Sequence, residues 1–328
     1  CNTLGRLLFM RVPLPAAMIT TSIAAMCLFL TWKKIIGELC SPALRKLRLA
    51  MIPLLFSLVG CSFVQTVYNQ SHELVYWWVD SYVDLQGEQR QTVPVDLLAF
   101  QQWHRQEQLP QYILWLQTMQ TMARQDVQEE QVCQMQAQFI ASLDDLTRQI
   151  EPAAARLALS LTPAQMRHLR RKLNRSHEDW RREWVEGNAA ERLERRVKKA
   201  VERSEDFYGR LDAAQRAALT QWVGSAGLDV AISEAERLRR QRDMLDTLQK
   251  IQDSRASLEA AQLEIRQLVQ RSLQSPEPAH LAHSQRLIRH NCRQLTWLHN
   301  TTTPAQRQKA LERLQFYEKT ARNLVAQR

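Results

Sequence analysis

Glycine is scarce in this sequence. Eight of the 328 residues are glycine, and five of them follow residue 60. That part of the chain also lacks a sustained alternation of apolar β-branched and polar residues, the pattern of a half-buried strand. Leu, Ala, Gln, Glu and Arg, which favour helices, predominate instead. These features exclude a β-rich fold and predict an all-α protein, an elongated multi-helix bundle of about ten helices.

The sequence also lacks the usual signatures of catalysis. It has no Gly-rich phosphate loop, no GxGxxG segment, no nucleophile elbow and no HExxH motif. Its six cysteines include no pair at zinc-ligand spacing. We therefore predict a protein that is not an enzyme and that binds no metal or dissociable cofactor.

A strong excess of one charge is absent from most of the chain. The formal net charge is +10, but seven of the 44 Lys and Arg residues and one of the 34 Asp and Glu residues lie in residues 1–60. The remainder therefore carries a net charge near +4 and has a mixed surface. This balance does not predict a nucleic-acid partner.

A short apolar run precedes Cys61. The basic residues Arg45, Lys46 and Arg48 come first, and the run 49–59 is too short to span a bilayer. Basic flank, apolar core and small residues are the layout of a signal peptide. The end of the run, Leu58-Val59-Gly60-Cys61, resembles a bacterial lipobox. A cysteine at the end of a buried helix is the alternative.

The lipobox resemblance implies a division of the chain. Residues 44–60 would be the signal peptide, cleavage would precede Cys61, and its thiol would carry the covalent lipid. Residues 61–328 would then form the helical lipoprotein domain. The apolar stretch within 1–43 is either translated upstream sequence or a further membrane segment. Ser62, where Asp would signal inner-membrane retention, implies the periplasmic face of the outer membrane in a Gram-negative envelope.

Two further cysteines follow in the predicted domain. An oxidising compartment outside the cytoplasm would permit a disulfide between Cys133 and Cys292. They are otherwise two buried thiols, and the sequence leaves both possibilities open.

Three predicted helices begin with a common pattern. In each quoted segment the second residue is the capping residue, and the Gln three positions later completes a capping box. The segments are Leu161-Thr162-Pro163-Ala164-Gln165, Leu211-Asp212-Ala213-Ala214-Gln215 and Thr302-Thr303-Pro304-Ala305-Gln306. Well-capped helix starts explain this pattern without a further function.

Proline marks two predicted helix ends. We expect a helix over 86–106 to stop before Leu109-Pro110, and a helix over 126–150 to stop at Glu151-Pro152. The stretch 151–161 is therefore a possible sub-boundary within the domain.

One polar cluster is a candidate for chemistry. His104 and Glu107 are three residues apart and share a helix face, so they could supply two metal ligands or an acid–base pair. We favour a structural or partner-binding role, in which His104, Arg105 and Glu107 bond to Asp80 or Asp84.

A basic segment is a second candidate site. Arg167, Arg170, Arg171 and Arg175 follow one another at helical spacing. They could bind anionic phospholipid, lipopolysaccharide phosphates or acidic unfolded chains. A solvated helix face is the simpler interpretation.

Several blocks resemble a known family of bacterial lipoproteins. They are Tyr82-Val83-Asp84-Leu85 with Gln89, Trp103-His104-Arg105, Leu109-Pro110-Gln111-Tyr112, Arg195-Arg196, Glu202-Arg203, Phe207-Tyr208-Gly209-Arg210-Leu211 with Gln215, and Ala305-Gln306-Arg307. With the lipobox they resemble the uncharacterised lipoproteins catalogued as domain of unknown function 6279. That resemblance implies location and fold but no activity.

A shorter resemblance suggests an alternative function. Leu161-Thr162-Pro163-Ala164-Gln165 is similar to the Leu-Thr-x-x-Gln motif of periplasmic proteins of the Spy/CpxP type, which implies a chaperone or envelope-stress adaptor. We favour a non-catalytic, structural or partner-binding lipoprotein. Its expected partners are membrane lipid, through the acyl anchor, and an envelope protein. A hydrolase or metal enzyme using His104 and Glu107 is the third class.

Overall fold

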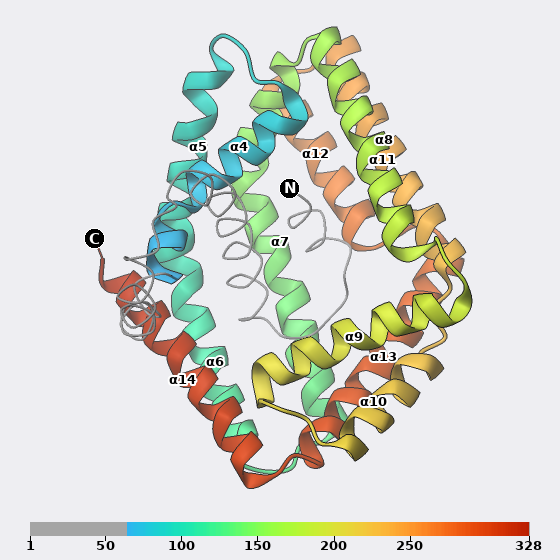
Figure 1. Cartoon of the computed structure of the whole chain (residues 1–328). Helices are drawn as coiled ribbons and strands as arrows, with labels where there is room; N and C mark the ends of the chain where they lie inside the picture. Colours follow the sequence, from blue (N-terminus) through green and yellow to red (C-terminus); the bar gives the residue numbers. More distant parts are fainter. Residues whose placement is uncertain (1–63, 328) are drawn as a thin grey trace, which may run out of the picture.

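A computed structural model describes residues 64–327 of the chain (Figure 1). Within that range the structure consists of helices and connecting turns, which confirms the predicted all-α fold. The predicted upstream segment 1–43, the predicted signal peptide 44–60 and Cys61 lie outside the described residues. None of the described helices is both long and apolar enough to cross a bilayer.

The helices are joined by short connections and form a four-sided frame, with α7 crossing behind it (Figure 1). A helical turn at 64–69 precedes them. In chain order they are α4 (Ser71–Val83), α5 (Gln89–Trp103), the π-helix η2 (His104–Gln108), α6 (Leu109–Ala123), α7 (Glu129–Ser160), α8 (Pro163–Trp184), α9 (Ala189–Tyr208), α10 (Ala213–Ser225), α11 (Val230–Asp253), α12 (Leu258–Leu273), α13 (Pro278–Asn300) and α14 (Pro304–Ala326).

Two halves of the described chain repeat one pattern of helix contacts. In the first half, α4 contacts α5 and α8, and α5 contacts α7. In the second half, α9 contacts α10 and α14, and α10 contacts α13. The halves also exchange helices, because α6 packs along α14 and α11 packs along α8. The fold is therefore two related helical units, each completed by the other.

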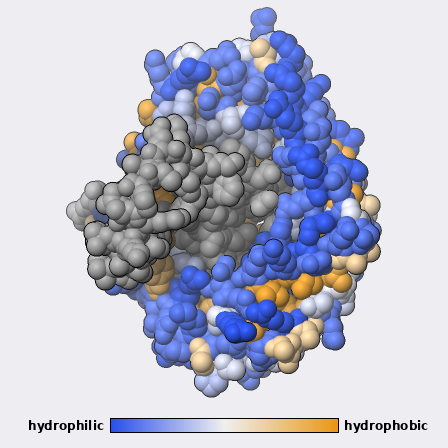
Figure 2. All heavy atoms as spheres, viewed as in Figure 1, coloured by the Kyte–Doolittle hydropathy of each residue, from blue (hydrophilic) through white to orange (hydrophobic). Residues whose placement is uncertain are grey.

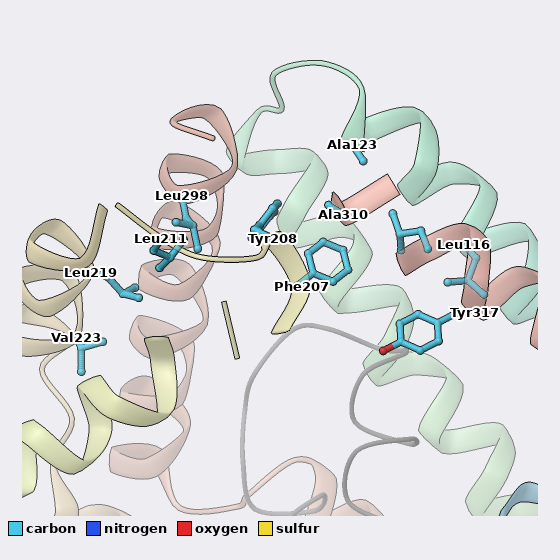
Figure 3. Close-up of a cluster of buried hydrophobic side chains, with 11 residues drawn as sticks. Leu116, Ala123, Phe207, Tyr208, Leu211, Leu219, Val223, Leu298, Ala310 and Tyr317 are labelled. Atoms are coloured by element: carbon cyan, nitrogen blue, oxygen red, sulfur yellow. The ribbon is translucent and has the colours of Figure 1, made fainter. Parts of the chain in front are cut away.

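The two largest hydrophobic cores both join the halves. One core combines Leu116 of α6 with Phe207, Leu219, Leu298 and other side chains of the second half (Figure 3). The second core combines α7 and α8 with α11 and α12; its fully buried members include Ala155, Ile251 and Ala261. Because burying a large apolar side chain contributes about 1.5–3 kcal/mol, the exchanged helices add stabilisation to both cores.

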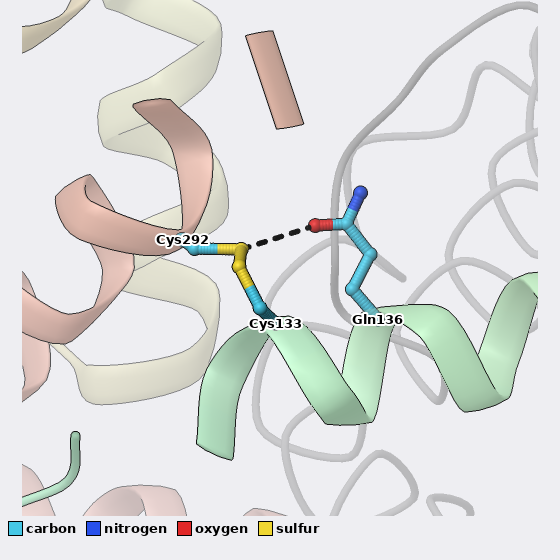
Figure 4. Close-up of a disulfide and its surroundings, with 3 residues drawn as sticks. All are labelled: Cys133, Gln136 and Cys292. Carbon is cyan, nitrogen blue, oxygen red and sulfur yellow. Dashed lines mark hydrogen bonds between the residues drawn. A yellow bond between two sulfur atoms is a disulfide. The ribbon is translucent and has the colours of Figure 1, made fainter. Parts of the chain in front are cut away.

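A disulfide joins the same two halves. Cys133 on α7 and Cys292 on α13 are bonded, with Cα atoms 5.5 Å apart across a sequence separation of 159 residues (Figure 4). Of the two alternatives left by the sequence, the disulfide is the one that the structure contains. The Gln136 Oε1 atom lies 3.7 Å from the Cys292 sulfur. Since a bonded sulfur carries no proton, this is a packing contact. The bond indicates an oxidising compartment outside the cytoplasm.

The two predicted helix ends at proline are wrong. At Pro110 the helical backbone continues from α5 through η2 into α6. The wider π-helical turn of η2 accommodates proline, which has no backbone N–H. At Pro152, α7 continues to Ser160. An interior proline costs about 3 kcal/mol. Here, contacts beyond it, including the fully buried Ala155, hold the helix against α12.

Candidate functional site

His104 is held in η2 by a half-buried tyrosine. Its Nδ1 atom lies 2.9 Å from the Tyr68 hydroxyl, and its ring packs edge-on against Tyr112. Burial lowers the pKa of His104 to about 4 and raises the pKa of Tyr68 to about 12. At neutral pH the imidazole is uncharged and the hydroxyl keeps its proton, so we assign Tyr68 as the donor. His104 therefore joins two segments of the fold.

Arg105 binds the same N-terminal segment and the C-terminus. Its Nη2 atom donates to Asn69 Oδ1 at 2.7 Å, its Nη1 atom donates to the Gln327 carbonyl at 3.3 Å, and its guanidinium lies over the Tyr68 ring at 5.6 Å. The neighbouring Gln101 amide donates to the backbone carbonyls of Tyr68 and Asn69. Gln101 also donates to the Ser71 hydroxyl, so these contacts together hold residues 68–71 against α5 and η2.

The predicted bonds from His104, Arg105 and Glu107 to Asp80 or Asp84 are wrong. Asp80 instead accepts a 2.9 Å hydrogen bond from the Leu85 backbone N–H, and Asp84 adopts a left-handed conformation (φ 60°) that ends α4. Glu107 is exposed. The two aspartates therefore terminate a helix. Among residues 64–327, no three His, Cys, Asp or Glu side chains converge on a metal-binding position.

The capping glutamines form two buried pairs. Gln215 and Gln306, at the starts of α10 and α14, exchange two side-chain amide hydrogen bonds of 2.9 Å each. Their Nε2 atoms also donate to the backbone carbonyls of Thr301 and Arg210. The capping boxes predicted at these two helix starts are both present. Each of these glutamine side chains thus caps its own helix and also hydrogen-bonds to the glutamine at the start of the other helix.

The first half contains the equivalent pair. Gln165, at the start of α8, donates to Gln89 Oε1 at 2.6 Å and receives a 3.3 Å hydrogen bond in return. Its Nε2 atom also donates to the Asp84 carbonyl at 2.9 Å. The capping pattern in the sequence predicted helix starts at three of these four glutamines; Gln89, the fourth, has no such pattern before it.

A shared spacing could have revealed this repeat. Tyr82, Leu85, Gln89 and Arg90 have the same spacing as Tyr208, Leu211, Gln215 and Arg216. Both leucines are buried, at 0% and 2% exposure. In each copy the arginine Nε atom donates back to the leucine carbonyl, at 2.6 Å and 3.3 Å respectively. The two segments are therefore equivalent corners of the two halves.

The predicted anion-binding residues lie together on the outside of α8. Arg167, Arg170, Arg171 and Arg175 are all exposed, and none forms an ion pair with another described residue. The later basic residues differ, because Arg181 pairs with Glu234 and Arg182 pairs with Asp179. The first three turns of α8 thus present uncompensated positive charge.

A charge cluster centred on a buried glutamate of α11 was not predicted from the sequence. The Glu236 carboxylate, 4% exposed, accepts from the guanidinium groups of Arg239 and Arg240 and from the Ser275 hydroxyl. Burial alone would raise the pKa of Glu236, but these hydrogen bonds and the arginine charges lower it to about 2. Asp243 and Arg271 extend the cluster to α12.

The fold and these paired corners define a class of all-α protein made of two interlocked helical halves. A family model, the family of unknown function DUF6279, matches residues 81–275. The chain belongs to that family, which confirms the family named from the sequence blocks. The match includes both repeated corners and the arginines of α8, while Ala305-Gln306-Arg307 lies beyond it. No curated protein and no solved structure matches the chain.

Proposed function

We propose that this protein is a lipid-anchored component of a Gram-negative envelope that binds a partner and has no catalytic activity. The observation that carries the proposal is the Cys133–Cys292 disulfide, because such bonds form and persist mainly in oxidising compartments that proteins reach by export. Export is also what the lipobox ending at Cys61 requires. Two or more acyl chains on this residue would provide stable membrane attachment.

The structural roles of the polar residues support a non-catalytic protein. His104, the strongest candidate for chemistry, is neutral, partly buried and bonded to Tyr68. Asp80 and Asp84 serve the backbone at the end of α4. These groups stabilise the frame, whose exposed faces are then available to a partner.

Fatty-acid labelling tests the anchor. Cells producing the full chain would be grown with an alkyne analogue of palmitate, with the Cys61→Ala variant as control. We expect label on the wild-type protein and none on the variant. Unlabelled wild-type protein that retains residues 1–60 would refute the proposal.

The membrane of residence has a separate test. We propose the periplasmic face of the outer membrane, because Ser62 rather than Asp follows Cys61. Membrane fractionation should place the wild-type protein in the outer membrane and the Ser62→Asp variant in the inner membrane. Wild-type protein in the inner membrane would exclude this location and leave the anchor proposal intact.

A chaperone or stress-adaptor role of the Spy/CpxP type is the second candidate. It is favoured by exposed apolar side chains on a partly basic surface, among them Trp77, Val95 and Leu114, which are 61%, 66% and 56% exposed. The purified protein should then suppress aggregation of an unfolded client at near-stoichiometric amounts. Undiminished aggregation would remove this candidate.

A further inference from the structure

The exposed face of α8 is a row of guanidinium groups. Arg167, Arg170, Arg171 and Arg175 lie within nine residues, which is about 12 Å of helix, and share one side of it. Helical spacings of three and four residues place them on that side together. We propose that this arginine face docks on the phosphates of anionic phospholipid headgroups at a membrane surface.

The polarity of the arginine face favours the phosphates of a membrane surface over a protein partner. None of the large exposed apolar side chains in the described chain lies on α8. Figure 2 shows a hydrophilic surface over the side of the molecule where α8 and α11 lie. Stable protein interfaces usually have an apolar, aromatic centre, which this face lacks. Guanidinium groups, by contrast, match phosphate oxygens in charge and in hydrogen-bond geometry.

The aromatic residues of α8 are engaged elsewhere and do not favour single-stranded nucleic acid. Trp180 stacks on His177 and lies 5.8 Å from the Arg237 guanidinium, and Trp184 lies 4.7 Å from the Lys199 ammonium. Stacking platforms need exposed rings between the basic residues. The two tryptophans therefore contact different partners.

The second half of the chain shows that the fold does not require these arginines. Aligning Gln165 of α8 with Gln306 of α14 pairs the four arginines with Gln308, Leu311, Glu312 and Phe316. The equivalent helix therefore carries no basic row at these positions. The arginines of α8 are a feature of its exposed face and not of the repeated scaffold.

The proposal deepens the proposed function, since a lipid-anchored protein lies beside such a surface. Its test avoids the anchor so that the two can fail separately. The full chain with Cys61→Ala would be sedimented with vesicles of phosphatidylcholine alone, and with vesicles of phosphatidylcholine and phosphatidylglycerol in equal parts. We expect binding that is stronger to the anionic vesicles and that weakens as salt is raised.

Two matched variants locate the binding face. In the Cys61→Ala background, Arg167→Gln, Arg171→Gln and Arg175→Gln together should weaken binding to anionic vesicles roughly a hundredfold, since each basic residue near such a surface contributes a factor of about five. The control replaces Arg286, Arg289 and Arg293, which are exposed on α13 and form no ion pair with a described residue. It removes the same charge and should bind nearly as tightly as its parent.

Three outcomes would overturn the proposal. These are equal binding to neutral and anionic vesicles, an equal loss in both triple variants, and binding to lipopolysaccharide or polyglutamate but not to phosphatidylglycerol. If the α8 arginines prove not to bind anionic vesicles, the fatty-acid labelling result at Cys61 would be unaffected. The anchor proposal would then stand. Circular dichroism of both triple variants would verify that each remains folded.

Discussion

Gln215 and Gln306 are 91 residues apart in the chain, and their side-chain amides face each other and exchange two hydrogen bonds. Each amide also completes the capping box of its own helix. Gln89 and Gln165 repeat the arrangement in the first half. The pairs thus fix two corners of the frame through groups that are almost fully buried.

The two glutamines of a pair should be energetically coupled, so the stability losses from replacing each one should not add. Gln215→Leu leaves buried donors and acceptors of Gln306 without partners, at about 1–3 kcal/mol for each unsatisfied group. We expect a loss of about 3 kcal/mol. In the Gln215→Leu, Gln306→Leu double variant, the loss should be smaller than the sum of the two single losses.

Thermal and urea unfolding would measure these differences. The exposed Gln308, two residues further along α14, is the control, and Gln308→Leu should change stability by less than about 0.5 kcal/mol. Strict additivity of the Gln215 and Gln306 losses would contradict a coupled pair.

The disulfide should stabilise the assembled frame. Replacing both Cys133 and Cys292 with Ser removes a link across 159 residues, and such links typically contribute about 2–5 kcal/mol. We expect a lower melting temperature than that of the wild-type protein and no further response to reductant. Native protein whose two thiols react with maleimide before any reduction would rule out the bond.

Acid should weaken the contact at His104. The folded-state pKa of about 4 lies below the ordinary value of 6.5, so the unfolded chain takes up a proton that the folded chain excludes. Stability from this group is complete above pH 6.5 and is lost as the pH falls toward 4. The difference corresponds to about 3 kcal/mol.

Urea unfolding between pH 7 and pH 4 would test this dependence. His104→Gln should reduce the slope, and part of the slope should remain because burial also lowers the pKa of His299. An unchanged slope in the variant would show that His104 does not titrate in this range.

Glu236 should be required for stability because it is buried and neutralises two partly buried arginines. Glu236→Gln keeps the shape of the side chain but leaves Arg239 and Arg240 with one less negative charge beside them. Breaking a buried pair in this way costs about 3–5 kcal/mol. The exposed pair of Asp144 and Arg148 supplies the comparison, and Asp144→Asn should cost less than about 0.5 kcal/mol. Similar melting temperatures for both variants would contradict the assigned role.

Local signals in the sequence predicted local structure well. Thr162, Asp212 and Thr303 were expected to cap helices, and each accepts the predicted hydrogen bond from the residue three positions on. All the atoms involved in such a cap lie within one turn, so no distant contact is needed to form it. Misplaced helix ends occurred at Pro110 and Pro152, where packing against other helices outweighed the local preference of proline.

The sequence by itself determined the helical class, three of the capping boxes and the exposed spacing of the α8 arginines, because each depends on residues within a few positions of one another. The tertiary structure decided that the glutamines pair, that Cys133 meets Cys292, that Glu236 is surrounded by arginines and that His104 binds Tyr68. These contacts join side chains from different segments of the chain. Their formation depends on how whole helices pack, which no short sequence pattern records.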